Sequence, residues 1–115
     1  MQNFKDLKVW HKAMDLVVLI YRETAKFPNE EKYGLTNQMR RCAVSIPSNI
    51  SEGHMRTTSK VFKQFIGIAR GSCSELETQN QIAYRLGFIP KEKYQELDEK
   101  ITEVAKMLSA FYAKL

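Results

Sequence analysis

The sequence is poor in the residues that mark several large classes of protein. Its 115 residues include only two cysteines, three prolines and five glycines, which excludes a disulfide framework, a proline-rich linker and a collagen-like repeat. The longest uninterrupted apolar run, residues 16–21, spans six residues, whereas a membrane span needs about twenty. Residues 1–6 contain no apolar stretch, so we expect no signal peptide, no membrane partner and a cytoplasmic location.

Patterns for catalysis and for metal or phosphate binding are missing as well. The chain has no Gly-rich phosphate-binding loop, and its two histidines, His11 and His54, do not fit the Glu-x-x-His spacing of a di-iron bundle. Ser45 and Ser48 have no histidine within one helical turn that could activate a nucleophile, and we expect no nucleophile at Ser51 either. We therefore expect a protein that is not an enzyme, with no catalytic residues, no metal and no cofactor.

The two cysteines are Cys42 and Cys73. They form no C-x-x-C pair and occupy apolar positions of predicted helices, so we interpret them as small, reduced core residues.

Apolar residues recur with the period of a helix in four segments, and no segment has the alternation of a strand. The predicted helices cover residues 4–25, 36–51, 59–86 and 90–115. Thr36 and Ser59 are the predicted N-caps, and Gly87 is the predicted left-handed residue after the third helix. Four such helices with short connections predict one domain, residues 1–115, folded as an antiparallel up-down-up-down four-helix bundle.

The fourth segment has a strict heptad seam, and the apolar residues of the first segment step by three and four along one face. In the second segment, Pro47 lacks the N–H for the Ala43 carbonyl, which predicts a kink, or a break near Ser45 with Gly53 ending the second piece. On the first segment the predicted core stripe comprises Leu7, Trp10, Met14, Val17, Val18 and Tyr21. The third segment's predicted stripe comprises Phe62, Phe65, Ile66, Ala69, Cys73, Leu76, Ile82, Ala83 and Leu86.

Apolar residues outside these stripes indicate a second buried surface, most simply a subunit interface. They are Val9, Leu19, Ile20, Val44, Ile68 and Tyr84. The alternative is that they are scattered apolar surface residues, which are common in monomeric proteins.

Positive charge is concentrated in the first part of the chain. The formal net charge is +5 overall, +6 for residues 1–70 and −1 for residues 71–115. Basic residues cluster on three predicted helices, and a face of this kind can follow a phosphate backbone. The candidate nucleic-acid contacts are Arg40, Arg41, Arg56, Lys60, Lys63 and Arg70. No aromatic residue interleaves with the third-helix stripe in the sequence, so base stacking is not predicted.

Several runs together resemble one known family. They are FKDLKVWHKA at residues 4–13, YGLTNQM at 33–39, RRCAVSIPSNISEG at 40–53, GSCSELETQ at 71–79 and AYRLG at 83–87. The chain resembles the bacterial four-helix-bundle proteins encoded within intervening sequences of 23S ribosomal RNA genes. It is also similar to the accessory variability determinant of diversity-generating retroelements.

This resemblance implies an antiparallel bundle that assembles as a ring-like homopentamer, without enzymatic activity. The retroelement relative is a basic barrel that binds nucleic acid and a reverse transcriptase. The chain departs from the family pattern at Asn80, a site often occupied by leucine, and we expect this side chain to be exposed rather than to lie at a subunit contact.

Our leading hypothesis is an oligomeric, non-catalytic bundle that binds structured RNA, or other nucleic acid, through basic helix faces and is associated with ribosomal RNA intervening sequences. The alternative is a protein-interaction scaffold or an accessory subunit for a nucleic-acid enzyme such as a reverse transcriptase. A small-molecule or metal-binding bundle has the least support.

Overall fold

The computed structural model describes residues 3–115, and within them it contains four α-helices and no strand. The helices are α1 (Lys8–Thr24), α2 (Leu35–His54), α3 (Ser59–Arg85) and α4 (Lys91–Lys114), with short 3-10 turns at Phe4–Asp6 and Asn29–Glu31. Met1 and Gln2, which entered the expectation of no signal peptide, lie outside the described residues. No helix in this part of the chain is both long enough and apolar enough to cross a membrane.

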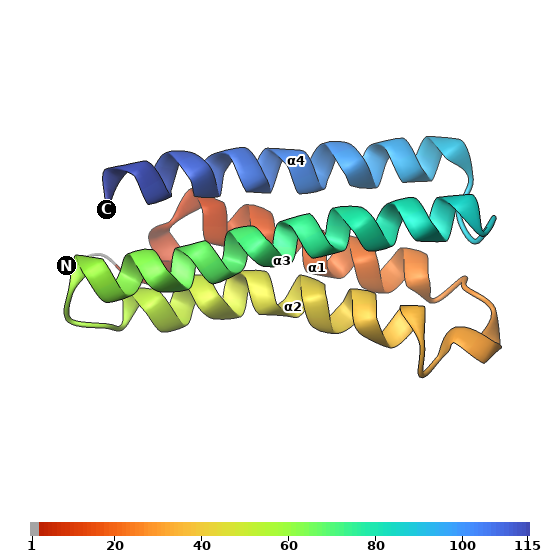
Figure 1. Cartoon of the computed structure of the whole chain (residues 1–115), viewed down its shortest axis with the longest axis horizontal. Helices are drawn as coiled ribbons and strands as arrows, with labels where there is room; N and C mark the ends of the chain where they lie inside the picture. Colours follow the sequence, from red (N-terminus) through yellow and green to blue (C-terminus); the bar gives the residue numbers. More distant parts are fainter. Residues whose placement is uncertain (1–2) are drawn as a thin grey trace.

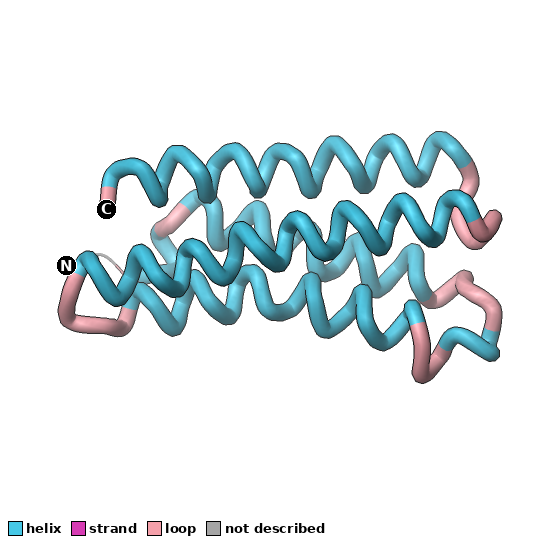
Figure 2. Tube along the Cα trace, viewed as in Figure 1, coloured by secondary structure: helices cyan, strands magenta, loops and turns pink. Residues whose placement is uncertain are grey.

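The helices form an elongated bundle of 44 × 24 × 20 Å. Each helix packs on two others: α1 and α3 both contact α2 and α4, whereas α1 does not contact α3 and α2 does not contact α4. The α2–α3 connection and the C-terminus lie at the left end in Figure 1, and the α1–α2 and α3–α4 connections lie at the right end. The connections are short, as the tube trace shows (Figure 2).

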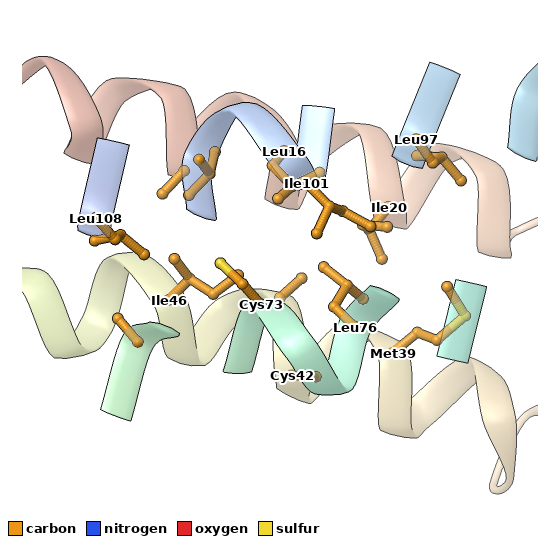
Figure 3. Close-up of a cluster of buried hydrophobic side chains, with 14 of the residues drawn as sticks. Leu16, Ile20, Met39, Cys42, Ile46, Cys73, Leu76, Leu97, Ile101 and Leu108 are labelled. Carbon is orange, nitrogen blue, oxygen red and sulfur yellow. The ribbon is translucent and has the colours of Figure 1, made fainter. Parts of the chain in front are cut away.

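The bundle encloses one apolar core to which all four helices contribute (Figure 3). The heptad seam of α4 is confirmed, because Leu97, Ile101, Val104 and Leu108 are all buried. Burial of a leucine or isoleucine contributes about 1.5–3 kcal/mol. The largest buried side chains of the other helices are Leu16, Ile20, Met39, Ile46, Ile50, Ile66 and Leu76.

The predicted core stripe of α1 is wrong for three of its six residues, whereas Leu7, Trp10 and Val17 are partly buried and pack against the core. Met14, Val18 and Tyr21 are 39–45% exposed, whereas Val9 and Ile20, which lie outside the predicted stripe, are buried. Ala13 and Leu16 complete the buried face of α1. Apolar residues surround much of this helix, so packing on α2 and α4 selects a face that spacing alone does not distinguish.

The predicted burial of three residues of α3 and its C-terminal end is also wrong. Ile82 and Leu86 are exposed rather than in the core, and Asn80, expected at the surface, is fully buried. The Asn80 Nδ2 donates to the Tyr94 carbonyl at 3.2 Å. Its Oδ1 is buried without a partner among the described residues. Val44 and Ile68, which the sequence assigns either to a subunit interface or to the surface, are exposed in the single chain.

Helix α2 continues through Pro47 to His54, so the predicted break near Ser45 does not occur. Two side chains support the backbone around the proline: the Ser45 Oγ donates to the Cys42 carbonyl at 2.8 Å, and the Asn49 Nδ2 donates to the Ser45 carbonyl at 2.7 Å. Gly53 lies inside the last turn instead of ending the helix.

Gly53 allows α2 and α3 to approach closely at their shared end. A Cβ added at Gly53 would lie 2.6 Å from the Phe65 Cβ and 2.8 Å from the Phe62 Cδ1. Both distances are far below van der Waals contact, so a side chain here would force the helices apart.

The helix ends differ slightly from the sequence prediction. The hydroxyl of Thr58, not of Ser59, caps α3 by accepting the Val61 N–H at 3.2 Å. At the start of α2 the Leu35 N–H donates to the Glu31 Oε1, while Thr36 is buried within the helix. Gly87 has φ +78°, as predicted for the residue that follows α3.

Candidate nucleic-acid interface

Lys60, Lys63 and Arg70 share one side of α3, with Gly67 between the last two. Lys60, Lys63, Gly67 and Arg70 follow one another at intervals of three, four and three residues, which puts them on one face of the helix. Lys60 is exposed, and Lys63 and Arg70 are half-buried. Among residues 3–115, none of the three cations has a carboxylate within 4.0 Å. We call Lys60, Lys63 and Arg70 the cationic stripe.

The aromatic ring of Tyr112, from α4, lies against this stripe. The Lys63 Nζ is 4.6 Å from the ring centroid and the Arg70 Cζ is 4.5 Å from it. The ring also covers Gly67, where an added Cβ would lie 3.5 Å from the Tyr112 Cε2. The expectation that no aromatic residue interleaves with the stripe is therefore wrong, because the ring comes from a different helix.

Arg56 lies at the α2–α3 connection, one turn before the stripe. Its Nη2 forms an ion pair with the Glu52 Oε1, and its guanidinium lies 5.2 Å from the Phe65 ring centroid. The nearby carboxylate offsets the charge of Arg56, which distinguishes this residue from the three cations of the stripe.

Arg40 makes structural contacts with the end of α1. Its Nε donates to the Thr24 Oγ1 at 2.9 Å, its Nη2 donates to the Tyr21 carbonyl at 3.2 Å, and its guanidinium lies 4.6 Å from the Tyr21 ring centroid. A cation here also compensates the partial negative charge at the C-terminus of α1. Arg40 thus links α2 to α1.

Arg41 follows Arg40 in the chain but is exposed. Successive residues of a helix point about 100° apart, so the two arginines do not form one patch. The six candidate residues therefore fall into separate groups, of which only the cationic stripe brings three cations together on one face.

The α1–α4 groove has a different electrostatic character. Lys12 in this groove lies 3.7 Å from the Glu103 Oε2. The groove's other charged residues are Asp15, Arg22, Glu96 and Lys100. Acidic and basic side chains lie side by side in this groove, so its electrostatic potential is less positive than that of the stripe.

The remaining candidate chemical groups are buried or dispersed. Cys42 and Cys73 are free and buried, in agreement with the prediction of reduced core residues. Burial raises the pKa of Cys42 to about 11 and that of Cys73 to about 12. Within the described residues, no three or more His, Cys, Asp or Glu side chains are grouped so that they could hold a metal ion.

Four amphipathic helices around a single core, with unpaired cations along one helix, define a small all-α four-helix-bundle protein with one cationic flank. The chain belongs to the 23S rRNA-intervening sequence protein family, which it matches over residues 5–110.

A solved structure of the same architecture supports the fold. It is a crystal structure of a protein of unknown function from the S23 ribosomal protein family of Bacteroides thetaiotaomicron. The two chains are 25% identical and superpose with a TM-score of 0.85, over 91% of this chain and 95% of the other. No curated protein matches this chain in sequence.

Proposed function

We propose that this protein is a non-catalytic, oligomeric RNA-binding bundle that holds the phosphate backbone of structured RNA along the cationic stripe. One observation carries the proposal: Lys60, Lys63 and Arg70 converge on one face of α3 without a carboxylate within 4.0 Å among residues 3–115. Membership of the 23S rRNA-intervening sequence protein family makes RNA from such an intervening sequence the first ligand to test.

Contacts of this kind recognise charge and not base sequence. Lysine and arginine bind phosphate oxygens, which position a nucleic acid but carry little sequence information. Each phosphate contact contributes about 0.7–0.9 to the slope of log K against log salt. Three contacts for each protomer therefore predict a slope of roughly 2–3 if one protomer binds alone.

We further propose that copies of the antiparallel bundle assemble into a ring, with five copies as the family resemblance implies. Exposed apolar residues lie on two different flanks: Met14 and Val18 of α1 with Val44 of α2, and Ile68 and Ile82 of α3. A contact between two unlike surfaces is heterologous, and a heterologous contact generates a ring when its rotation closes.

The RNA-binding proposal is tested by fluorescence anisotropy with a labelled RNA hairpin and a single strand of equal length, titrated at several salt concentrations. The triple variant Lys60→Glu, Lys63→Glu, Arg70→Glu is expected to reduce affinity at least tenfold and to lower the salt slope. Its matched control reverses three exposed lysines elsewhere, Lys32, Lys91 and Lys100. No binding by the native protein at low salt, or equal loss in both variants, would refute the proposal.

A scaffold function is the second candidate, favoured by the 39–45% exposure of Met14, Val18, Val44 and Tyr21. In this role the protein would be an accessory subunit of a nucleic-acid enzyme. Light scattering of the double variant Val18→Glu, Val44→Glu shows whether this surface serves self-assembly or binds a partner enzyme. A fall from oligomer to monomer supports self-assembly, whereas an unchanged oligomer that no longer binds an enzyme encoded beside its gene supports the scaffold.

A further inference from the structure

The Tyr112 ring contacts two cations of the stripe. Lys63 and Arg70 are seven residues apart, so their α-carbons are about 10 Å apart along the α3 axis. Their charged ends nevertheless lie 4.6 and 4.5 Å from the same ring centroid. The two charges are consequently no more than about 9.1 Å apart.

Among the described residues, the Tyr112 ring is the contact that orders the charged ends of these two side chains. Both are long and rotamer-rich, they lack a carboxylate partner among the described residues, and they repel each other. The aromatic ring attracts a cation to its face. Lys63 and Arg70 stem from positions before and after Gly67, and the Tyr112 ring contacts both of their charged ends.

We propose that Tyr112 is a positioning residue that holds Lys63 and Arg70 as a preset pair of cations for two phosphodiester groups. The inference rests on the proposed RNA-binding function and adds a residue of α4 to a site otherwise built on α3. Ordering the two side chains before RNA arrives removes part of the entropy cost of binding, which is roughly 0.5–1.5 kcal/mol for each long side chain.

The same geometry determines which part of the RNA the site contacts. Two cations lie within 4.6 Å of the Tyr112 ring centroid, so they occupy the ring on which a base would otherwise stack. The site therefore binds the backbone, and the affinities for oligomers of adenosine and of uridine of equal length are expected to agree within about twofold.

Tyr112→Leu, Tyr112→Phe and the native protein are compared by the anisotropy titration described above. Leucine removes the ring but keeps both charges, so affinity is expected to fall roughly fivefold or more while the salt slope is unchanged, because the number of neutralised phosphates is the same. Phenylalanine keeps the ring, and native affinity is expected. Phe111→Leu is the matched control, since Phe111 is a half-buried ring of α4 that packs on Phe62 and forms no cation–π pair among residues 3–115.

The outcomes separate this inference from the proposed function. If the native protein does not bind RNA, the proposed function fails. If it binds, and charge reversal of the stripe weakens binding, but Tyr112→Leu matches native affinity, the positioning role is refuted. Equal losses in Tyr112→Leu and Phe111→Leu, or a lower salt slope in Tyr112→Leu, also refute it. Circular dichroism of each variant identifies any loss that arises from unfolding.

Discussion

Alanine substitutions at two helical glycines are expected to change stability in opposite directions. An alanine in a helix is normally favoured over glycine by about 0.5–1 kcal/mol, because it loses less backbone entropy on folding. Gly71 lies within α3 and an added Cβ there meets nothing within 4 Å. Gly71→Ala is thus expected to stabilise the protein by about 0.5–1 kcal/mol.

At Gly53 the same change produces a severe overlap. The new Cβ would lie 2.6 Å from the Phe65 Cβ, whose position is set by the α3 backbone and not by a flexible side-chain end. Normal carbon contacts are about 3.5–4.0 Å, so α3 must move by about 1 Å or the local packing must be lost. Overpacking of this kind costs about 1–3 kcal/mol. Because this cost exceeds the helix-propensity gain, we expect net destabilisation of about 1–2 kcal/mol.

Thermal unfolding followed by circular dichroism measures both variants against the native protein. One kcal/mol corresponds to roughly 3–6 °C in Tm for a domain of this size, so the two variants are expected to differ by several degrees around the native value. Stabilisation by Gly53→Ala equal to that of Gly71→Ala would refute the close helix approach. Destabilisation by Gly71→Ala would show that its open surface is covered, for example by a second copy of the chain.

Three further predictions concern buried or partly buried polar groups. Asn80→Asp is expected to destabilise the fold by about 3 kcal/mol or more at pH 7. Desolvation raises the pKa of the new carboxyl in the folded state, so the loss grows as pH rises above about 4, and denaturant melts at pH 4 and 7 measure it. Burial raises the pKa values of Cys42 and Cys73 to about 11 and 12, so both thiols are expected to resist alkylation by iodoacetamide at pH 8 until guanidinium unfolds the protein. Mass spectrometry measures the alkylation, and rapid labelling of the native protein would contradict the burial of the thiols. Arg40→Ala is expected to lower stability by about 1–2 kcal/mol and to leave the RNA salt slope unchanged; an altered slope would place Arg40 at the RNA.

The sequence predicts the architecture well because the helix period and the turn residues agree. The seam of α4 has a single consistent face, and Gly87 and Pro90 separate it clearly from α3. Asn80 is a position where the sequence prediction failed. It lies on the buried face between Leu76 and Ala83, so its position indicates burial, whereas its residue type suggests exposure. Here the helical position was the better guide.

The candidate site was only half visible in the sequence. The spacing of Lys60, Lys63 and Arg70 identifies the stripe, but Tyr112 reaches it from another helix, 42 residues after Arg70. Arg40 shows the converse, because its basic side chain looked available to RNA but bonds to the end of α1. Both contacts depend on how the helices pack together, and spacing within one helix does not report that packing.

The arrangement of the four helices bears on how assembly and RNA binding can coexist. Tyr21 and Arg40 meet where α1 packs on α2, and the exposed Val18 and Val44 each lie within one helical turn of that contact. The stripe and Tyr112 meet where α3 packs on α4. Since α1 does not contact α3 and α2 does not contact α4, these two helix pairs form opposite sides of the bundle. In the proposed ring, the α1–α2 side of one copy meets the flank of α3 that carries Ile68 and Ile82 in the next copy. Ile68 follows Gly67 in α3 and points about 100° away from it, so RNA binding along the stripe requires that this contact stop short of Lys60, Lys63 and Arg70.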